Sequence, residues 1–233
     1  MKKTPTKSLI LLIFIFLFAG VSYSQVSFNA DIYSRYNWRG IDFGDSPSFQ
    51  PYVTFATGGF SLGVWGSYGW AGTPGGVYSE SDLWASYAVQ TEAGSFSVIY
   101  TDYFFPYAGL KYSNYKNNGN GAHTLEGGLS YSGPSSFPIT VSGYYNLYND
   151  PDKSSYFQIG YPFTVGDVGV SIFAGASGSK SAAYGTTKFA FINTGLTFTK
   201  TIPVTDKFSI PATASLVYNP NTSLLYLIFG ITI

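Results

Sequence analysis

The chain of 233 residues contains no cysteine, a single histidine and few charges, since Asp, Glu, Lys and Arg together make up 10% of it. Without cysteine there is neither a disulfide framework nor a lipid-modified N-terminal cysteine, which excludes a stapled secreted domain and a lipoprotein. The few basic residues form no stripe of the kind that nucleic-acid binding requires. Nucleic acid is therefore not expected as a partner.

Long hydrophobic runs are also missing beyond the first residues, because Gly, Ser, Asn or a charge interrupts every apolar run well before the roughly 18 residues that a spanning helix needs. At the start, three lysines flank the apolar run from Leu9 to Phe18, and the small residues Ser22 and Ser24 suit a cleavage site. We therefore expect residues 1–24 to be a cleaved signal peptide and residues 25–233 to form one domain. A retained membrane anchor is the alternative.

What the chain has in excess is aromatic residues and glycine, with 21 Tyr, 20 Phe and 27 Gly. From Val26 onward every second residue tends to be apolar or aromatic, and the residues between are mostly small and polar, which is typical of strands with one apolar face. With so few charges, the apolar face is expected to meet lipid, and the aromatic residues suit girdles at the two membrane interfaces. Because strands cross a membrane only within a closed barrel, we predict an all-β, antiparallel, up-and-down transmembrane barrel.

The alternating segments number twelve, an even number as in single-chain bacterial barrels. Short turns such as Gly58-Gly59 alternate with longer links such as residues 106–121, and this asymmetry predicts that both termini lie in the periplasm. A soluble sandwich or a lipocalin-like barrel is the alternative, but a Gly-, Ser- and Thr-rich interior would make a poor soluble core. The predicted strands are residues 27–38, 48–57, 60–71, 81–90, 95–105, 122–131, 137–147, 154–163, 168–176, 188–199, 208–218 and 223–233, and residues 200–207 are predicted to be a turn.

The polar parity of each strand should face the lumen, which twelve tilted strands leave about 12 Å wide if no loop folds in. In the first strand, Tyr36 and Trp38 fall on the apolar parity and are expected to face lipid. Trp65 and Trp84 face inward on neighbouring strands and are expected to be cross-strand neighbours. The aromatic lumen residues would form either a slide for a ligand or wall packing, and the charged ones either a selectivity ring or ion pairs within the wall. The pore-lining candidates are Asp31, Tyr33, Arg35, Tyr52, Trp65, Asp82, Trp84, Glu126 and Tyr144.

Two residues on the apolar parity need an explanation. Asp102 is the one charge of a strand interior on this parity, where a bulge or a position near the rim would accommodate it. His123 is also on this parity, and in the twelve-stranded outer-membrane phospholipase, similar in strand count, the nucleophilic Ser stands two residues after a His; here that position is Leu125. We expect no catalytic residues and no enzyme, and a lipid hydrolase is the least favoured alternative. Residues 149–152 suit a turn better than a Ca²⁺ site with its about six or more oxygen ligands, so no metal or cofactor is expected.

A family resemblance rests on six segments: Ser34–Asp42, Pro47–Pro51, Gly63–Ser67, Asp82–Tyr87, Tyr100–Pro106 and Glu126–Tyr131. Together they resemble the TorF family of porins, and the opening Ser-Arg-Tyr-x-x-Arg-Gly block is the most specific of them. The resemblance covers roughly residues 30–178 and implies an exported bacterial outer-membrane barrel with a channel role and no catalytic motif. The chain ends in Ile233 where such barrels often end in Phe, although the alternation of apolar residues continues to this end.

The sequence thus leads to a functional hypothesis. We expect a passive channel for small polar solutes in the outer membrane of a Gram-negative bacterium, and the alternative is a closed barrel with a structural or surface-interaction role. The expected partners are outer-membrane lipid, the barrel assembly machinery during biogenesis, and the solutes.

Overall fold

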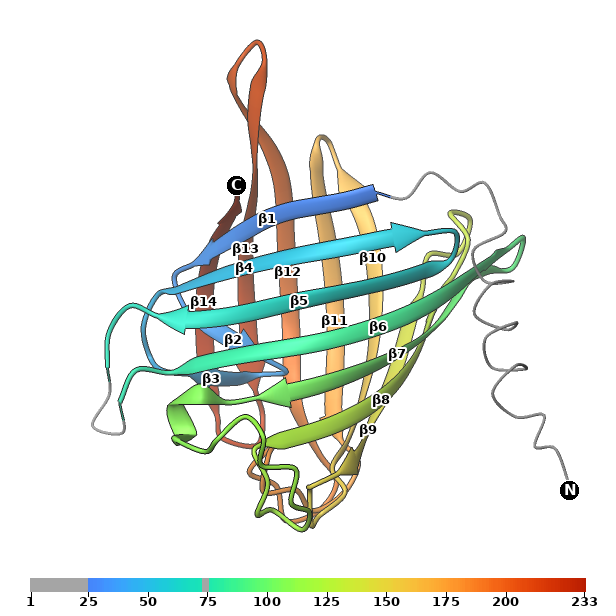
Figure 1. Ribbon diagram of the computed structural model, residues 1–233. Coiled ribbons are helices and arrows are strands. Elements are labelled where there is room, and N and C mark those ends of the chain that lie inside the picture. Colours follow the sequence, from blue (N-terminus) through green and yellow to red (C-terminus); the bar gives the residue numbers. More distant parts are fainter. Residues whose placement is uncertain (1–24, 73–75) are drawn as a thin grey trace, which may run out of the picture.

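A computed structural model describes residues 25–72 and 76–233 (Figure 1). The expected signal peptide, residues 1–24, lies outside the described residues. Within the described part of the chain, no helix is long and apolar enough to cross a membrane. Twelve antiparallel strands close into a barrel, which confirms the predicted fold class and the predicted number of strands.

The wall of the barrel follows the order of the chain, and its first strand pairs with both the second and the last wall strand. A separate two-stranded hairpin, β2 (Tyr36–Trp38) and β3 (Ile41–Phe43), is not part of the wall, and one 3-10 turn, η1 (Pro106–Ala108), follows β7. The wall strands are β1 (Gln25–Tyr33), β4 (Ser48–Thr57), β5 (Phe60–Gly69), β6 (Ser79–Thr91), β7 (Gly94–Phe104), β8 (His123–Ser132), β9 (Thr140–Tyr148), β10 (Ser155–Val165), β11 (Val168–Ser177), β12 (Ala190–Thr205), β13 (Phe208–Asn219) and β14 (Leu224–Thr232).

Side chains alternate between the two faces of the wall, as predicted. In β5, Leu62 and Val64 are exposed on the outside, whereas Ser67 is fully buried within the barrel. The strands turn their polar faces inward and their apolar faces outward, which is the reverse of a soluble protein with an apolar core. The apolar outer surface is consistent with a membrane barrel. Other exposed apolar residues of the wall include Phe60, Leu83, Val98, Leu129, Ile172, Phe208 and Phe229.

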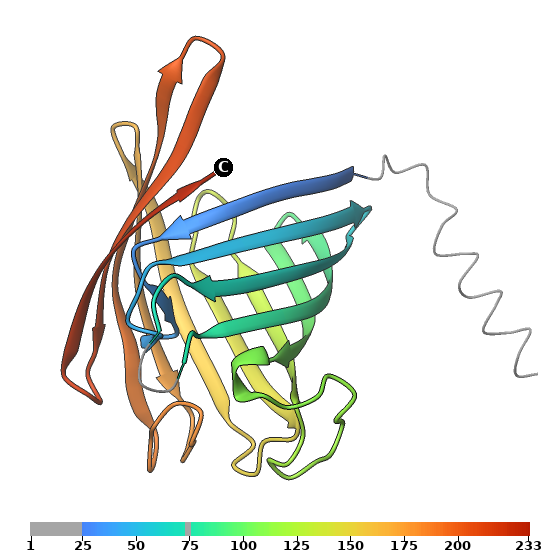
Figure 2. The same ribbon diagram turned by 60° about the vertical axis from the view of Figure 1, so that its left-hand side comes forward.

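The first predicted strand, residues 27–38, is wrong in its second half. β1 leaves the wall after Tyr33, and the N–H of the next residue, Ser34, donates a last hydrogen bond of 2.7 Å to the carbonyl of Phe229 in β14. Strand β2 therefore lies inside the barrel (Figures 1 and 2). Its residues Tyr36 and Trp38, which were predicted to face lipid, pack instead against the wall residues Trp65 and Tyr103. Tyr36 is only 7% exposed.

The hairpin turns at Arg39 and Gly40, whose φ angles are +53° and +80°. Positive φ at both central residues is the requirement of a two-residue type I′ turn, which matches the twist of the strands on either side. Gly40 is also needed for space, because a Cβ atom there would lie 1.8 Å from the carbonyl oxygen of Ile192 in β12. A segment that continues the alternation of the wall thus folds back into the lumen; we call residues 34–47 the lumen hairpin.

The connection between β12 and β13 also differs from the prediction of a turn at residues 200–207. β12 continues to Thr205, which pairs with Phe208, so the turn shrinks to Asp206 and Lys207. The pairing of β12 with β11 ends earlier, at Thr199. The tip of the β12–β13 hairpin therefore projects beyond its neighbours (Figure 1).

Both ends of the described chain lie at the end of the barrel that has the short turns. Gln25 pairs with Ala56, beside the Gly58-Gly59 turn, and Ile231 pairs with Ala212 on the side of β13 that leads to the short β12–β13 turn. The long loops gather at the opposite end. β1 closes the barrel on β14 through only three register pairs, from Asp31–Thr232 to Tyr33–Gly230, whereas nine pairs join it to β4.

The alternation predicts opposite effects of one substitution at two adjacent positions of β11. Ile172, midway along the strand, is exposed on the outer face, and Ser171 points inward. Because a basic side chain facing lipid near the midplane costs about 2–4 kcal/mol, Ile172→Arg should lower the free energy of unfolding by that amount. Ser171→Arg should lower it much less. Guanidinium unfolding in lipid vesicles, followed by tryptophan fluorescence, measures both, and equal losses would contradict the assignment of faces.

Candidate functional site in the barrel lumen

The lumen hairpin crosses the interior near the long-loop end, and its fixed point is the side chain of Arg39. The Arg39 guanidinium makes a bidentate ion pair with Glu126 of β8, with N–O distances of 2.6 and 2.9 Å. The Tyr103 hydroxyl donates to Glu126 at 2.8 Å, and Arg39 also donates to the Tyr184 hydroxyl. The Arg39 and Glu126 side chains are 8% and 3% exposed, so this is a buried ion pair joining residues 87 positions apart.

Aromatic rings surround the same guanidinium. Its Cζ atom lies 4.1 Å from the ring centre of Tyr144, 4.2 Å from that of Trp38 and 4.7 Å from that of Tyr156. Cations over aromatic faces at such distances are attracted by the ring quadrupole, by about 2 kcal/mol or more when the cation is desolvated. A carboxylate and three ring faces thus compensate the loss of hydration of Arg39.

The wall departs from regular pairing where the lumen hairpin meets it. Between β8 and β9 the register shifts beside Glu126 and skips Leu147, and between β11 and β12 a second shift skips Ile192. The carbonyl of Ile192 is the group that Gly40 contacts closely, and Asn219 of β13 donates to the carbonyl of Gly40 at 3.0 Å. Bulges of this kind redirect side chains and are frequent beside functional sites.

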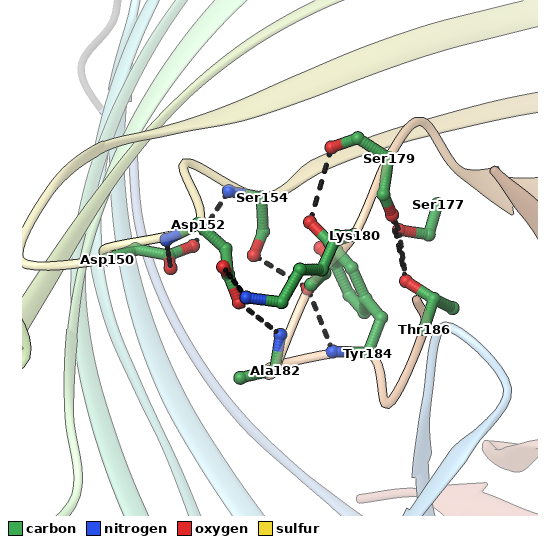
Figure 3. Close-up of polar contacts among 10 residues, drawn as sticks. Asp150, Asp152, Ser154, Ser177, Ser179, Lys180, Ala182, Tyr184 and Thr186 are labelled. Carbon is green, nitrogen blue, oxygen red and sulfur yellow. Dashed lines mark hydrogen bonds and ion pairs between the residues drawn. The ribbon is translucent and has the colours of Figure 1, made fainter. Parts of the chain in front are cut away.

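Two loops position Tyr184, whose hydroxyl accepts a hydrogen bond from Arg39. Figure 3 shows the polar contacts within and between these loops. The loop that follows β9 and the loop that follows β11 are joined by a 2.6 Å hydrogen bond between the hydroxyls of Ser154 and Ser181, and Ser181 also accepts the N–H of Tyr184. Lys180 pairs with Asp152 at 2.9 Å, and this hydrogen bond, with the N–H of Ala182, holds the pKa of Asp152 below its usual range. Asp152 therefore stays ionised at pH values above its ordinary pKa of about 3.9, and the ion pair persists there for as long as Lys180 keeps its proton.

The base of the lumen hairpin has a second set of contacts. Arg35 makes ion pairs with two acids of the hairpin itself, Asp42 and Asp45. Tyr36 packs its ring 5.5 Å from Trp65 and 5.7 Å from Tyr78. The hairpin is therefore held against β5 and β6 as well as against β8.

Between the lumen hairpin and the short-turn end lies a cavity of about 780 Å³. Its lining combines aromatic rings with hydroxyl, amide and carboxyl groups, which is the composition of a site for a small amphipathic or polar solute. Seven of the nine pore-lining candidates border it: Asp31, Tyr33, Arg35, Tyr52, Trp65, Asp82 and Trp84. The remaining two, Glu126 and Tyr144, lie at the long-loop end and contact Arg39.

The candidates do not form one ring. Trp65 lies opposite Asp82 and Trp84 lies opposite Gly63, so the two tryptophans are diagonal neighbours and not a directly opposed pair. Asp31 accepts a hydrogen bond of 2.6 Å from the Thr232 hydroxyl across the β1–β14 junction. Two charged candidates form ion pairs, Arg35 with Asp42 and Asp45 and Glu126 with Arg39. Their partners all belong to the lumen hairpin, which was not predicted as an element inside the barrel.

Five residues at the Arg39–Glu126 ion pair were missed as candidates: Trp38, Arg39, Tyr103, Tyr156 and Tyr184. The sequence contains one clue, the Arg39-Gly40 pair between the alternating tripeptides 36–38 and 41–43, which is a two-residue hairpin pattern. Tyr184 lies in a loop with no alternation, so nothing in its local sequence points to the lumen.

His123 and Asp102 form a separate polar pair on the outer face near the long-loop end. Asp102 is on the outer parity, between Leu83 and Leu125 on the neighbouring strands, and its carboxylate lies 2.8 Å from Nδ1 of His123. Nε2 of His123 lies 2.5 Å from the carbonyl oxygen of Tyr112, and the ring stacks on Tyr115 at 4.0 Å. The predicted exception to the alternation is thus explained by pairing, and the pair fastens the loop after η1 to the wall.

Fold and lumen together define the class of this protein as a closed twelve-stranded antiparallel barrel whose apolar outer surface is consistent with a membrane barrel. No protein-family model matches the chain, and no curated protein matches it.

The ion pair predicts the behaviour of the lumen hairpin when Glu126 is neutralised. Breaking one side of a buried ion pair costs about 3–5 kcal/mol because the other charge stays buried. In Glu126→Gln we expect Arg39 to leave its site, so that amides of residues 34–47 exchange with deuterium at least about a hundredfold faster. Mass spectrometry of the exchanged peptides measures this.

A matched control is Asp167→Asn, which removes the partner of Lys200 from an ion pair that is largely exposed. Such pairs contribute about 0–1 kcal/mol, so exchange in residues 34–47 should be unaltered. Unchanged protection in Glu126→Gln would show that the ion pair does not hold the hairpin.

Proposed function

We propose that this protein is an outer-membrane barrel of a Gram-negative bacterium that passes small polar solutes passively through a lumen narrowed by its own hairpin. The observation that supports this most is the cavity of about 780 Å³ inside the barrel, bordered by polar and aromatic side chains of the wall and on one side by the lumen hairpin. A polar cavity inside an apolar cylinder is what a path for solutes through a membrane requires.

Several further features support the location. The short turns and both described chain ends share one end of the barrel, which places that end in the periplasm if the barrel follows the usual outer-membrane arrangement. The predicted signal peptide would export the chain, and the barrel assembly machinery would insert it among outer-membrane lipids. The resemblance of residues 30–178 to the TorF family of porins agrees with this proposal.

A closed barrel with a structural or surface-interaction role is the second candidate. The observation that favours it is the depth of the Arg39 site, where a buried bidentate ion pair and three rings fix the hairpin across the lumen. Lipid hydrolysis is not proposed, because both ring nitrogens of His123 face the partners of a structural contact. The proposal contains no enzymatic step, no metal and no cofactor.

Single-channel recording in planar bilayers tests the channel. Purified, heat-modifiable protein should give small conductance steps, and Arg39→Ala should give steps at least about twice as large, because the hairpin loses its main contacts and vacates part of a lumen about 12 Å wide. Asp167→Asn should give the steps of the unaltered protein.

Two outcomes would decide against the channel. Absence of steps from both the unaltered protein and Arg39→Ala, with each folded by the heat-modifiability criterion, favours the closed barrel. Steps of equal size in the two proteins would instead show that the hairpin does not limit the conducting path.

A further inference from the structure

The cavity has an unbalanced charge. The chain has only two arginines, Arg35 and Arg39, and both belong to the lumen hairpin and already have acidic partners. Arg35 pairs with two acids, and Arg39 pairs with one. No described lysine makes an ion pair with an acid that borders the cavity.

This arrangement leaves both acids that border the cavity, Asp31 and Asp82, without a cation from the described residues. Asp31 accepts a hydrogen bond from the Thr232 hydroxyl and is half-buried, and the buried acid of the two is Asp82. It lies on the inner face of β6, borders the cavity and is 8% exposed, and no described residue forms an ion pair with it. Its Oδ1 accepts no hydrogen bond from the described residues. Four buried side-chain polar atoms of the described residues have no hydrogen-bond partner, and of these only Asp82 Oδ1 belongs to an acid that borders the cavity. A buried carboxylate without a counter-ion is costly, so such a group stays protonated until a ligand supplies a cation.

Aromatic rings flank Asp82 on both sides. In the register of the wall, Trp65 of β5 lies directly opposite it, and so does Tyr103 of β7. Two rings of the lumen hairpin extend this surface, since Tyr36 lies 5.5 Å from Trp65 and Trp38 lies 5.8 Å from Tyr103. A carboxyl group between aromatic rings is a site for an organic cation, which pairs with the carboxylate and lies against the ring faces.

The same barrel already binds a cation in this way. At the neighbouring site, the guanidinium of Arg39 meets the carboxylate of Glu126 and ring faces at 4.1 to 4.7 Å. The Asp82 site has the same kinds of groups, and Tyr103 serves both sites, donating to Glu126 and lying opposite Asp82. What it lacks is a cation from the described residues of the chain.

We propose that the cavity binds a small organic cation bearing a guanidinium or primary ammonium group, with Asp82 as its counter-ion and Trp65 and Tyr103 as its aromatic walls. If the protein is the channel proposed above, such cations are the class of solute that it passes, and only this statement rests on the proposed function. Binding itself requires the folded barrel and not conduction. Two acids, Asp31 and Asp82, border the cavity, and both arginines that do so are paired, so anions should be disfavoured.

Isothermal titration of the full barrel in detergent tests the site with butylguanidinium as the probe. Butyramide and butyrate are the neutral and anionic controls of similar size. The unaltered protein should bind butylguanidinium at least about tenfold more tightly than either control. Asp82→Asn, which keeps the shape and removes the charge, should weaken butylguanidinium binding at least about tenfold. Trp65→Leu should weaken it several-fold, and Asp167→Asn, at a short turn away from the cavity, should leave it unchanged.

Equal affinity of the unaltered protein for the three probes would overturn the proposal. This comparison needs no variant, so it decides the matter even where Asp82→Asn does not fold. Unchanged affinity in a heat-modifiable Asp82→Asn would overturn it as well. Conducting protein that does not bind butylguanidinium would refute this site and leave the channel intact. Protein that binds it but gives no steps in bilayers would refute the channel and leave the site intact.

Discussion

The interior of this barrel depends on one buried ion pair, between Arg39 on an in-folded hairpin and Glu126 on the wall. Taking two charges out of water costs several kcal/mol per ion, and the attraction between them compensates only when the geometry is good and the remaining donors and acceptors are satisfied. Both conditions hold here, since the contact is bidentate and Tyr103 donates to the same carboxylate. This contact fixes the tip of the hairpin, while the ring of Tyr36 holds its base against Trp65 and Tyr78.

The alternation of apolar and polar residues was enough to predict the wall, because each strand has one face in contact with the lumen and one turned away from it. It failed at residues 34–43 for a physical reason. The rings of Tyr36 and Trp38 continue the apolar parity of β1, and a period of two cannot distinguish rings that face lipid from rings that pack against other rings inside the barrel. Six of the seven pore-lining candidates that border the cavity lie in wall strands, where inward parity suffices to place them, and the seventh, Arg35, borders it as part of the lumen hairpin. The Arg39 site was missed because it joins a turn, four wall strands and a loop that only the closed fold brings together.

Aromatic residues have two roles in this chain, and composition alone suggested one of them. Outside, rings such as Phe208 and Phe229 are exposed on the wall, where lipid would cover them. Inside, Trp38, Tyr144 and Tyr156 surround a guanidinium that has lost its water. The inner role requires irregular backbone, and the register shifts at Leu147 and Ile192 occur where the hairpin touches the wall. A perfectly regular cylinder would offer the hairpin no such fit.

The short junction between β1 and β14 couples closure of the barrel to the placement of the lumen hairpin inside it. Three register pairs join these strands, and hydrogen bonds extend the junction at both ends. At one end Ala30 and Ile233 bond to each other, and at the other the N–H and hydroxyl of Ser34, the first residue of the hairpin, both bond to the backbone of Phe229. Pairing of the first strand with the last therefore also fixes the start of the inner segment. A cylinder with an unobstructed bore would have to lack these bonds, so closure of the wall and narrowing of its interior are one structural event.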